Sequence, residues 1–286
     1  MDFTKMQGAG NDFIVVEAAN LKCDWAQLAR AMCDRHFGIG ADGLLLALPS
    51  DIADIRMRMF NPDGSEAEAC GNGLRCLVKY AAEGMGLLED TGAEMSVETM
   101  AGVRQAKLFR TGEKLTKIQV SLGQPEFKAK YIPATVKAGE GDISADRMIS
   151  YPVVIAGRQL VLNLVSMGNP HAVHFVAEPV AEFPLFQIGP EIENLNVFPN
   201  RVNFETARVI NSNKIEVRVW ERGAGETPAC GSGAGAVAVA AQLKGYVGSV
   251  VDIMLPGGIL TVEWDGAGEV LLSGPAEAVY NGEWPK

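Results

Sequence analysis

A five-residue pattern, Ala-Cys-Gly-x-Gly, occurs twice in this chain, and its two cysteines, Cys70 and Cys230, lie 160 residues apart. A weaker echo upstream aligns Gly10-Asn11 with Gly168-Asn169 at an offset of 158, and an apolar stretch follows each pair, at 13–16 and at 172–175. The overlay around the cysteines continues without gaps and aligns Phe60 with Trp220, Asn61 with Glu221, Glu66 with Glu226 and Leu77-Val78 with Val237-Ala238. This repeat of strand, polar loop, cysteine and helix predicts a duplicated domain with its active site on the pseudo-symmetry axis.

The composition favours an acidic protein with two hydrophobic cores. The chain has 286 residues, of which 48% are hydrophobic, and this is enough for two domains of ordinary size. Its net charge of −10 argues against nucleic acid or an anionic membrane as partner, because both require clustered lysine and arginine. The longest apolar runs, near 44–48 and 234–241, are shorter than the roughly 18–20 residues of a membrane span. With five irregularly spaced cysteines and no secretory signal segment, we expect a cytoplasmic protein with reduced thiols.

Hydrophobic periodicity predicts a mixed α/β (α+β) fold that is rich in strands. Helical patterns cover residues 24–35, 71–83, 231–244 and, weakly, 181–194. Strand patterns cover residues 2–6, 12–17, 43–48, 54–60, 94–99, 102–109, 115–121, 153–156, 159–165, 172–177, 202–210, 214–220, 250–254, 259–264 and 269–272. The segment 123–150 has little periodicity, so we divide the chain into domains 1–124 and 125–274.

The two repeated cysteines each stand at the expected start of a helix. Each sulfur would therefore lie against unpaired backbone N–H groups and the positive end of the helix dipole, an environment that stabilises a thiolate. Flanking glycines let a carboxylate approach the backbone closely. Two such helix ends that faced each other could invert a carbon bearing a carboxylate: one thiolate removes the α-proton, and the opposite thiol returns a proton to the other face.

A lone cysteine is more often a small buried hydrophobe than a functional group. The duplication argues against that interpretation for Cys70 and Cys230. We keep the interpretation as a small buried hydrophobe for Cys23, Cys33 and Cys76, because these cysteines have no counterpart in the other half.

Several linked motifs together resemble the diaminopimelate epimerase family. Besides the two cysteine motifs they are Gly8-Ala9-Gly10-Asn11-Asp12-Phe13, Gly38-Ile39-Gly40-Ala41-Asp42-Gly43, Phe60-Asn61-Pro62-Asp63-Gly64-Ser65, Met167-Gly168-Asn169-Pro170-His171, Arg201-Val202-Asn203 and Glu221-Arg222-Gly223-Ala224-Gly225-Glu226-Thr227. The resemblance implies a two-base epimerase that needs no cofactor or metal and interconverts LL- and meso-2,6-diaminopimelate in lysine and peptidoglycan precursor biosynthesis. It also implies two pseudo-symmetric domains, each a curved sheet wrapped around a central helix, with the active site in the cleft between them.

The same resemblance assigns roles to individual residues. Cys70 and Cys230 would be the acid and base, and His171 and Glu221 would tune their protonation. Substrate contacts would come from Asn11, Asn61, Gly71, Asn72, Asn169, Asn203, Glu221, Arg222, Gly231 and Ser232. Amide side chains that donate and accept, with an arginine for a bidentate carboxylate contact, suit a substrate with two amino-carboxylate ends.

The sequence departs from the family pattern at three positions. Gly43 replaces a glutamine that contacts substrate in some members, and Ser232 replaces a common threonine. Gly235 stands where many members have a further cysteine.

The Gly-rich segment 38–43 also matches a dinucleotide fingerprint, but a helix precedes it and a strand follows, which is the reverse of the required order.

Three other functions are compatible with parts of the sequence. A racemase of another amino acid could use the same paired cysteines, although Arg222 with Asn61, Asn169 and Asn203 favours a second amino-carboxylate end. A thiol redox protein is disfavoured because redox cysteines usually stand close together, as in Cys-x-x-Cys. A non-catalytic carboxylate-binding module would not need both thiols.

The C-terminal segment 275–286 is expected, from the resemblance, to return to the first domain. It carries Tyr280, which matches a tyrosine associated with dimer formation in the family. An exposed tyrosine on an edge strand is a surface that partners bury, so a homodimer is expected. The alternative is a terminal strand that only completes the N-terminal sheet.

Overall fold

The computed structural model describes residues 1–19, 21–67, 70–87, 94–112, 114–136, 142–143 and 148–285. The chain forms two compact units, one from residues 1–121 and 273–286 and the other from residues 122–272.

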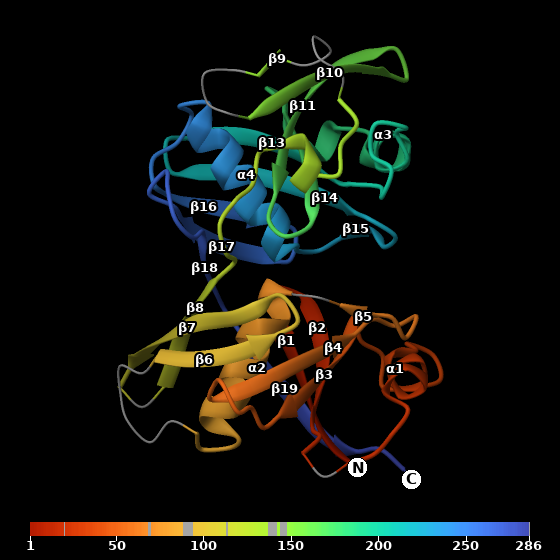
Figure 1. The fold of residues 1–286 in the computed structure, drawn as a ribbon, viewed down its shortest axis with the longest axis vertical. Helices are drawn as coiled ribbons and strands as arrows, with labels where there is room; N and C mark the ends of the chain where they lie inside the picture. Colours follow the sequence, from red (N-terminus) through yellow and green to blue (C-terminus); the bar gives the residue numbers. More distant parts are fainter. Residues whose placement is uncertain are drawn as a thin grey trace. The chain divides into compact units, whose positions relative to one another are not determined.

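In its described residues the first unit contains two helices and a sheet (Figure 1). Its elements are β1 (Asp2–Gly8), β2 (Asn11–Glu17), α1 (Trp25–Cys33), β3 (Gly43–Leu48), β4 (Ile55–Phe60), β5 (Glu66–Ala67), α2 (Gly71–Glu83), β6 (Glu94–Thr99), β7 (Gly102–Thr111), β8 (Lys114–Ser121) and β19 (Glu277–Glu283). The strands pair in the order β19–β1–β2–β3–β4–β6–β7–β8, and β5 pairs with β4.

The second unit repeats this plan. Its elements are a 3₁₀ turn η1 (Ala129–Tyr131), β9 (Asp142–Ile143), β10 (Ile149–Ile155), β11 (Arg158–Ser166), β12 (Pro170–Phe175), a 3₁₀ turn η2 (Val180–Glu182), α3 (Leu185–Glu193), β13 (Asn203–Asn211), β14 (Lys214–Glu221), β15 (Gly225–Thr227), α4 (Gly231–Leu243), β16 (Val250–Leu255) and β17 (Gly258–Glu263). The strands pair in the order β9–β10–β11–β12–β13–β14–β16–β17, and β15 pairs with β14. The chain returns to the first unit through β18 (Leu271–Gly274).

Each unit has two parallel strand pairs, and each parallel pair is joined by a helix. In the first unit α1 connects β2 to β3 and α2 connects β4 to β6; in the second, α3 connects β12 to β13 and α4 connects β14 to β16. A parallel pair requires such a crossover, whereas antiparallel neighbours are joined by short turns. The units therefore share one topology, and the predicted duplication and mixed α/β fold are confirmed.

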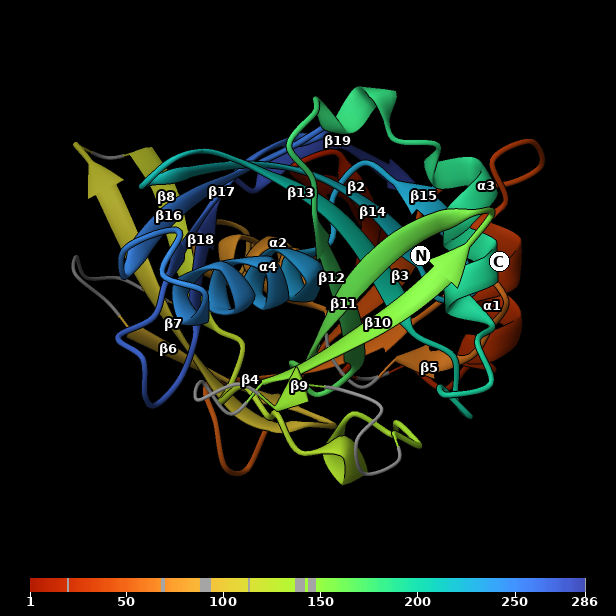
Figure 2. The same ribbon diagram turned by 90° about the horizontal axis from the view of Figure 1, so that it is seen from above.

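The helices α2 and α4 are the centres of the two cores (Figure 2). In the first unit α2 contacts β1, β2, β3, β4, β8 and β19, and in the second α4 contacts β11, β12, β13, β16 and β17. Every residue of α4 from 233 to 241 is buried, and all are Gly, Ala or Val. A helix that is apolar on all sides belongs in a core, so the predicted arrangement of a sheet around a central helix is confirmed.

An ion pair is duplicated together with the topology. Arg58 on β4 pairs with Glu66 on β5 at 2.6 Å, and Arg218 on β14 pairs with Glu226 on β15 at 2.7 Å. These residues are again 160 positions apart. The pair fixes the short second strand of each hairpin, which leads directly to the repeated cysteine.

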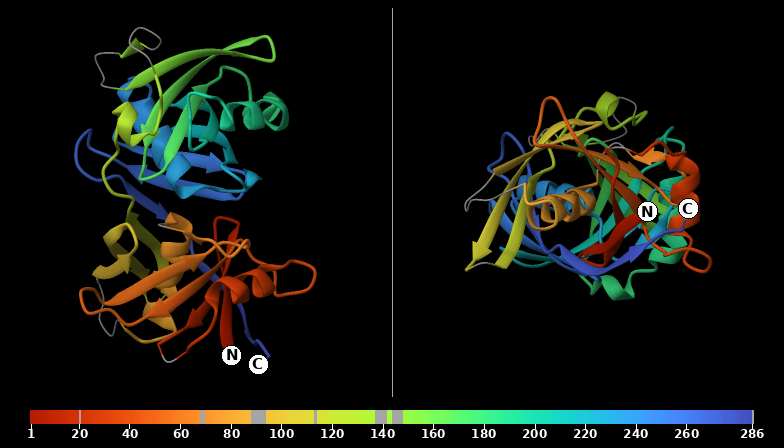
Figure 3. Two further views of the ribbon diagram at one scale, coloured as in Figure 1. Left: turned by 45° about the vertical axis from the view of Figure 1, so that its right-hand side comes forward. Right: turned by 90° about the horizontal axis from the view of Figure 1, so that it is seen from below.

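Both chain termini belong to the first unit and lie side by side (Figure 3). Strand β19 is antiparallel to β1, with Asp2 opposite Glu283, and the Met1 amino group donates to the Trp284 carbonyl at 2.8 Å. The C-terminal segment therefore completes the N-terminal sheet.

The secondary structure differs from the predictions at several places. The segment 181–194 is not one helix but η2 followed by α3, because Pro184 stands at the N-cap of α3. Strands β5, β9 and β15 were not predicted, and β19 was expected only as an edge or terminal strand of the C-terminal segment and not from a strand pattern. The first three have two or three residues, too few to show a periodicity of two.

Candidate active site

Both repeated cysteines are the N-cap residues of central helices. The Cys70 sulfur accepts a hydrogen bond from the Gly73 amide at 3.4 Å, and the Cys230 sulfur accepts one from the Gly233 amide at 3.4 Å. Serine, threonine, asparagine or aspartate usually occupies this position, because a side-chain oxygen satisfies the same amide. In this protein a cysteine sulfur accepts the hydrogen bond from that amide instead, at two equivalent positions of the fold.

In the first unit, two predicted asparagines lie beside Cys70. The Cys70 sulfur is 3.9 Å from Asn11 Oδ1, which also accepts a hydrogen bond from Asn72 Nδ2 at 3.2 Å. Asn11 Nδ2 donates to Asp42 Oδ2 at 2.6 Å, so the carboxylate fixes which end of the amide faces the cysteine. Asp42 belongs to the Gly-rich turn between α1 and β3, and the predicted order of helix, turn and strand is observed there.

Asn61 lies in the turn that follows β4 and is held within that turn. Its backbone amide donates to the Ser65 carbonyl at 2.8 Å, and its side-chain nitrogen donates to Ser65 Oγ at 2.9 Å. Gly71 is the first residue of α2.

In the second unit, a chain of polar contacts leads from a buried carboxylate to Cys230. Glu205 Oε1 lies 2.7 Å from His171 Nδ1, and both side chains are fully buried. His171 Nε2 lies 3.0 Å from Asn169 Oδ1, and Asn169 Nδ2 donates to Ser232 Oγ at 3.2 Å. Ser232 Oγ is 3.5 Å from the Cys230 sulfur. Both ring nitrogens of His171 therefore face an oxygen atom, Glu205 Oε1 on one side and Asn169 Oδ1 on the other, and the two contacts hold the imidazole in one orientation.

Glu221 is the second carboxyl group near Cys230. Its Oε1 accepts a short hydrogen bond from Thr227 Oγ1. Burial raises the pKa of Glu221, and the hydrogen bonds from Thr227 and Cys230 only partly oppose this effect.

The expectation of a thiolate-stabilising environment is wrong for Cys230. Burial, followed by the charge of Glu221, raises the pKa of the Cys230 thiol well above its usual value. The hydrogen bonds from Ser232 and the Gly233 amide act in the opposite direction but do not outweigh these effects. Cys230 is therefore a thiol at neutral pH, which suits a proton donor.

The predicted distal residues, Asn203 and Arg222, lie together on the second unit. Asn203 Nδ2 donates to the Pro170 carbonyl at 2.9 Å, and its Oδ1 accepts from the Arg222 amide at 2.9 Å. The Arg222 guanidinium donates to the Asn200 carbonyl at 3.1 Å in an exposed position. Asn203 thus connects the start of β12 with the loop after β14 through hydrogen bonds. Arg222, the first residue of that loop, is exposed. Gly231 is the first residue of α4.

The remaining cysteines divide into two groups. Cys33 and Cys76 are buried, and burial raises the pKa of each to about 12, so their structural role is confirmed. Cys23 is exposed before α1, so its expected burial is wrong.

Sequence reasoning missed three charged residues near the cysteines: Asp42, Glu205 and Arg75. Arg75 is fully buried in α2, although arginine is rarely buried without a paired acid. A comparison of the halves could have found two of them, because Arg75 aligns with Gly235 and Glu205 with Leu45 at the offset of 160. At both places a charged residue of one half stands opposite an apolar or small residue of the other.

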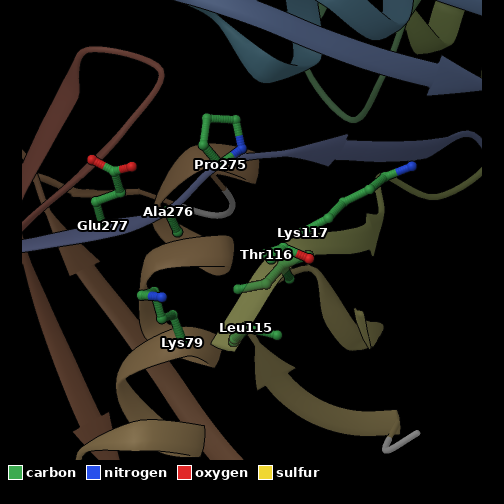
Figure 4. A pocket seen from close by; sticks show the side chains of 8 residues that line it. Lys79, Leu115, Thr116, Lys117, Pro275, Ala276 and Glu277 are labelled. Atoms are coloured by element: carbon green, nitrogen blue, oxygen red, sulfur yellow. The ribbon is translucent and has the colours of Figure 1, made fainter. Parts of the chain in front are cut away.

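A hollow of about 140 Å³ lies in the first unit, and none of the predicted site residues is among those that line it (Figure 4). It is lined by Lys79, Leu115, Thr116, Lys117, Ile118, Pro275, Ala276 and Glu277. Within the described part of the chain, no group of three or more His, Cys, Asp or Glu residues could hold a metal ion, and no helix is long and apolar enough to cross a membrane.

Comparison with solved structures identifies proteins of the same fold. The chain matches a probable proline racemase from Agrobacterium radiobacter with a TM-score of 0.72 at 14% identity, over 99% of this chain and 92% of the other. It matches a hydroxyproline epimerase from Agrobacterium vitis with a TM-score of 0.70 at 15% identity, over 99% and 90%. A phenazine biosynthesis protein of the PhzF family from Bacillus anthracis has a TM-score of 0.71 at 19% identity, over 100% and 99%.

Sequence comparison is more specific. A family model described as Diaminopimelate epimerase matches residues 3–128 and 163–279. Proteins named diaminopimelate epimerase from Desulfovibrio desulfuricans and Desulforudis audaxviator are each 46% identical to the chain, over 99% of its length and 97% and 99% of theirs. One from Methanococcus maripaludis is 43% identical over 99% of both chains.

The fold is shared with epimerases and racemases, and the protein is an isomerase. The sequence matches, which extend over nearly the whole chain, identify one family among these isomerases. The chain belongs to the diaminopimelate epimerase family.

Proposed function

We propose that this protein epimerises LL-2,6-diaminopimelate to the meso isomer by a two-base mechanism, with Cys70 and Cys230 as base and acid. The observation that carries the proposal is the duplicated cysteine N-cap, in which each sulfur accepts an amide hydrogen bond at 3.4 Å. Membership in the family supports the choice of substrate. The expected pathway is lysine and peptidoglycan precursor biosynthesis.

The proposed chemistry uses the two helix ends on opposite faces of one α-carbon. A thiolate takes the α-proton, the C–H bond breaks, and its electron pair moves into the carboxylate as an enediolate. The opposite thiol then donates its proton to the other face, and a new C–H bond forms with inverted configuration. The first sulfur ends as a thiol and the second as a thiolate.

The helix ends also stabilise the intermediate. Amides of the first turns, next to Gly71 and Gly231, point away from the helix toward any bound anion. The enediolate carries more charge on its oxygens than the ground-state carboxylate does, so these dipoles stabilise the transition state preferentially. The base and the acid both come from the chain, and the proposed reaction needs no cofactor.

The test is incubation of the purified protein with LL-diaminopimelate in heavy water under reducing conditions. We expect the meso product to appear with solvent deuterium at the α-carbon. Proline and other single-ended amino acids serve as parallel substrates, because turnover of one of these alone would identify a racemase of another amino acid. Absence of product and of deuterium in every arm would overturn the proposal.

We predict that Arg222→Lys lowers kcat/KM for diaminopimelate by about 10- to 100-fold, because an ammonium cannot reproduce the bidentate contact of a guanidinium with the distal carboxylate. Kinetics with an analogue that lacks the distal carboxylate should show little change. Arg208→Lys is the matched control, since Arg208 lies on β13 in a loose pair with Glu216 at 3.9 Å. Equal losses for both substrates would refute distal recognition by Arg222.

We predict a homodimer whose interface includes Tyr280. Strand β19 pairs with β1, and Val279 and Tyr280 are among its exposed side chains. An edge strand with apolar groups in solvent is a surface that a second copy would bury. Tyr280→Ala should raise the dimer dissociation constant at least tenfold in analytical ultracentrifugation. Tyr246→Ala, at a comparably exposed tyrosine of the second unit, is the control. A fully active wild-type monomer at micromolar concentration would contradict the prediction.

A further inference from the structure

Glu193 is a buried carboxylate at the C-terminal end of α3. It is the last residue of the helix, and 8% of its side chain is exposed. The C-terminus is the negative end of the helix dipole, where an acidic side chain is disfavoured. Burial of a carboxylate adds a further cost unless hydrogen bonds compensate it. Glu193 therefore does not stabilise its own helix through its charge, and its partners lie outside that helix.

Three donors from other parts of the second unit satisfy this carboxylate. Oε1 accepts a hydrogen bond from the Gly223 amide at 2.9 Å and one from Arg201 Nη1 at 3.1 Å, and Oε2 accepts one from Trp220 Nε1 at 2.8 Å. Trp220 lies near the end of β14, and Gly223 belongs to the exposed loop 222–224 that joins β14 to β15. Glu193 thus binds the chain both before this loop and within it.

The packing around Glu193 leaves the carboxylate little freedom. One turn earlier in α3, a Cβ on Gly189 would lie 2.6 Å from the Trp220 ring, so the helix backbone packs directly against the indole. Arg201 has a φ of 59°, in the left-handed region that residues other than glycine rarely adopt. The backbone accepts this conformation at the residue whose guanidinium pairs with Glu193. The carboxylate is therefore a rigid anchor for the loop.

The first unit anchors the equivalent loop from the equivalent helix with the opposite charge. Asp63 aligns with Gly223 at the offset of 160, and α1 and α3 are the matching crossover helices. Arg30 Nη1 on α1 donates to the Asp63 carbonyl at 2.8 Å. In the second unit the carboxylate of Glu193 accepts from the Gly223 amide instead. A charged side chain of the crossover helix thus holds the same loop residue in both units, although the residue type and the direction of the hydrogen bond differ.

We infer that Glu193 is a positioning residue for recognition of the distal carboxylate, because it fixes the loop that carries Arg222. Asn203 Oδ1 accepts from the Arg222 amide at 2.9 Å, so two side chains immobilise the backbone of two consecutive loop residues. A bidentate contact with a carboxylate requires a fixed guanidinium plane, and a loop that is ordered beforehand loses less entropy on binding. The inference rests on the proposed function, in which the substrate has a distal carboxylate.

The neighbouring carboxyl group, Glu221, is held independently of Glu193. Its Oε1 accepts a hydrogen bond from Thr227 Oγ1, and its backbone lies opposite Gly225 in the pairing of β14 with β15. Loss of Glu193 should therefore affect recognition and not the proton transfer at Cys230. The distal carboxylate keeps its charge throughout the reaction, so its contact stabilises the ground state and the transition state equally and acts on KM, not on kcat.

The first test is a kinetic comparison of Glu193 variants with diaminopimelate. Glu193→Leu removes both acceptor oxygens and should raise KM at least about tenfold, the usual effect of losing a hydrogen bond to a charged group, with kcat within about twofold of wild type. Glu193→Gln keeps the size of the side chain and one acceptor oxygen, so its KM should lie between the two. Glu191→Gln is the matched control, because it removes an exposed carboxylate from the same helix, and it should not change KM.

A double-mutant cycle with Arg222 separates positioning from a general structural role. In an Arg222→Ala background the loop carries no guanidinium to position, so Glu193→Leu should raise KM further by no more than about twofold. A variant that only weakens the fold would instead lower the activity of both backgrounds by the same factor. Multiplicative losses would therefore overturn the inference, as would an unchanged KM in Glu193→Leu. Glu193→Gln decides in the same way where the leucine variant does not fold.

Hydrogen–deuterium exchange without substrate tests the anchor independently of the reaction. Exchange in a peptide that covers residues 221–227 should become at least about tenfold faster in Glu193→Leu, because the Gly223 amide loses its acceptor, while residues 61–65 stay unchanged. A folded variant with unchanged exchange would refute the anchoring role. Absence of turnover by the wild type would refute the proposed function, and the exchange measurement would still decide whether Glu193 orders the loop.

Discussion

Replacing either Cys70 or Cys230 by alanine is expected to reduce epimerisation by at least about 10²–10⁴-fold, the usual contribution of a general acid or base. A two-base mechanism fails without either thiol, because one face of the α-carbon then lacks its proton donor or acceptor. Each sulfur accepts an amide hydrogen bond at 3.4 Å and makes weak polar contacts, with Asn11 for Cys70 and with Ser232 for Cys230. Loss of such weak contacts should not prevent folding, so the circular dichroism spectrum should be native.

Two controls accompany this measurement. Cys23→Ala removes an exposed thiol and should leave the rate unchanged, and Cys76→Ala removes a buried thiol of α2 and should lower stability more than activity. The assay is conversion of LL-diaminopimelate in heavy water. Near-wild-type turnover in a folded Cys70 or Cys230 variant would exclude that residue as base or acid.

The elements that form the fold could be predicted because their sequences carry strong local signals. The segments 71–83 and 231–244 each follow a cysteine between small residues and contain many apolar residues, so both central helices were predicted nearly to the residue. The long strands alternate or are wholly apolar, as in 43–48. Strand β19 lacks such a pattern, since most of its side chains are exposed, and only pairing with β1 makes it a strand.

The candidate site residues named from the sequence stay predictions, and the buried charged groups around them were not named. The asparagines, glycines and cysteines stand in short motifs that one sequence displays directly. Glu205 lies in a strand of buried residues, and its partner His171 is 34 positions away on the parallel strand β12. The pairing depends on strand register, which no local pattern specifies. The raised pKa of Cys230 likewise follows from burial, a property of the packed core and not of the motif.

The buried pair of His171 and Glu205 permits a test that separates stability from activity, because a double variant is expected to keep its stability and lose its activity. Its counterpart in the first unit is apolar: Phe13 lies opposite Gly43 as His171 lies opposite Asn203, and Leu45 takes the place of Glu205. The polar pair is therefore not needed to build this layer of the fold. Glu205 makes its hydrogen bond through Oε1, and Oε2 is buried with no partner in the described part of the chain.

The single variant His171→Phe should lower the free energy of unfolding by about 3–5 kcal/mol, because it leaves Glu205 buried without its partner. The double variant His171→Phe/Glu205→Leu should recover to within about 1 kcal/mol of wild type, since replacing a buried polar pair by packed apolar groups is often neutral or stabilising. Epimerisation should nevertheless fall by about 10²-fold in the double variant, because the contacts that lead from His171 through Asn169 and Ser232 to Cys230 are gone.

Urea unfolding and the heavy-water assay, run on the same preparations, distinguish the possible causes. Phe13→His/Leu45→Glu is the matched control, and it should place the polar pair in the first unit without restoring activity to the double variant. A double variant as unstable as the single one would show that the loss comes from the shape of the imidazole site and not from an unpaired carboxyl group. A stable double variant with wild-type turnover would show that catalysis at Cys230 does not depend on His171, because the helix end and Glu221 would then suffice to control its proton.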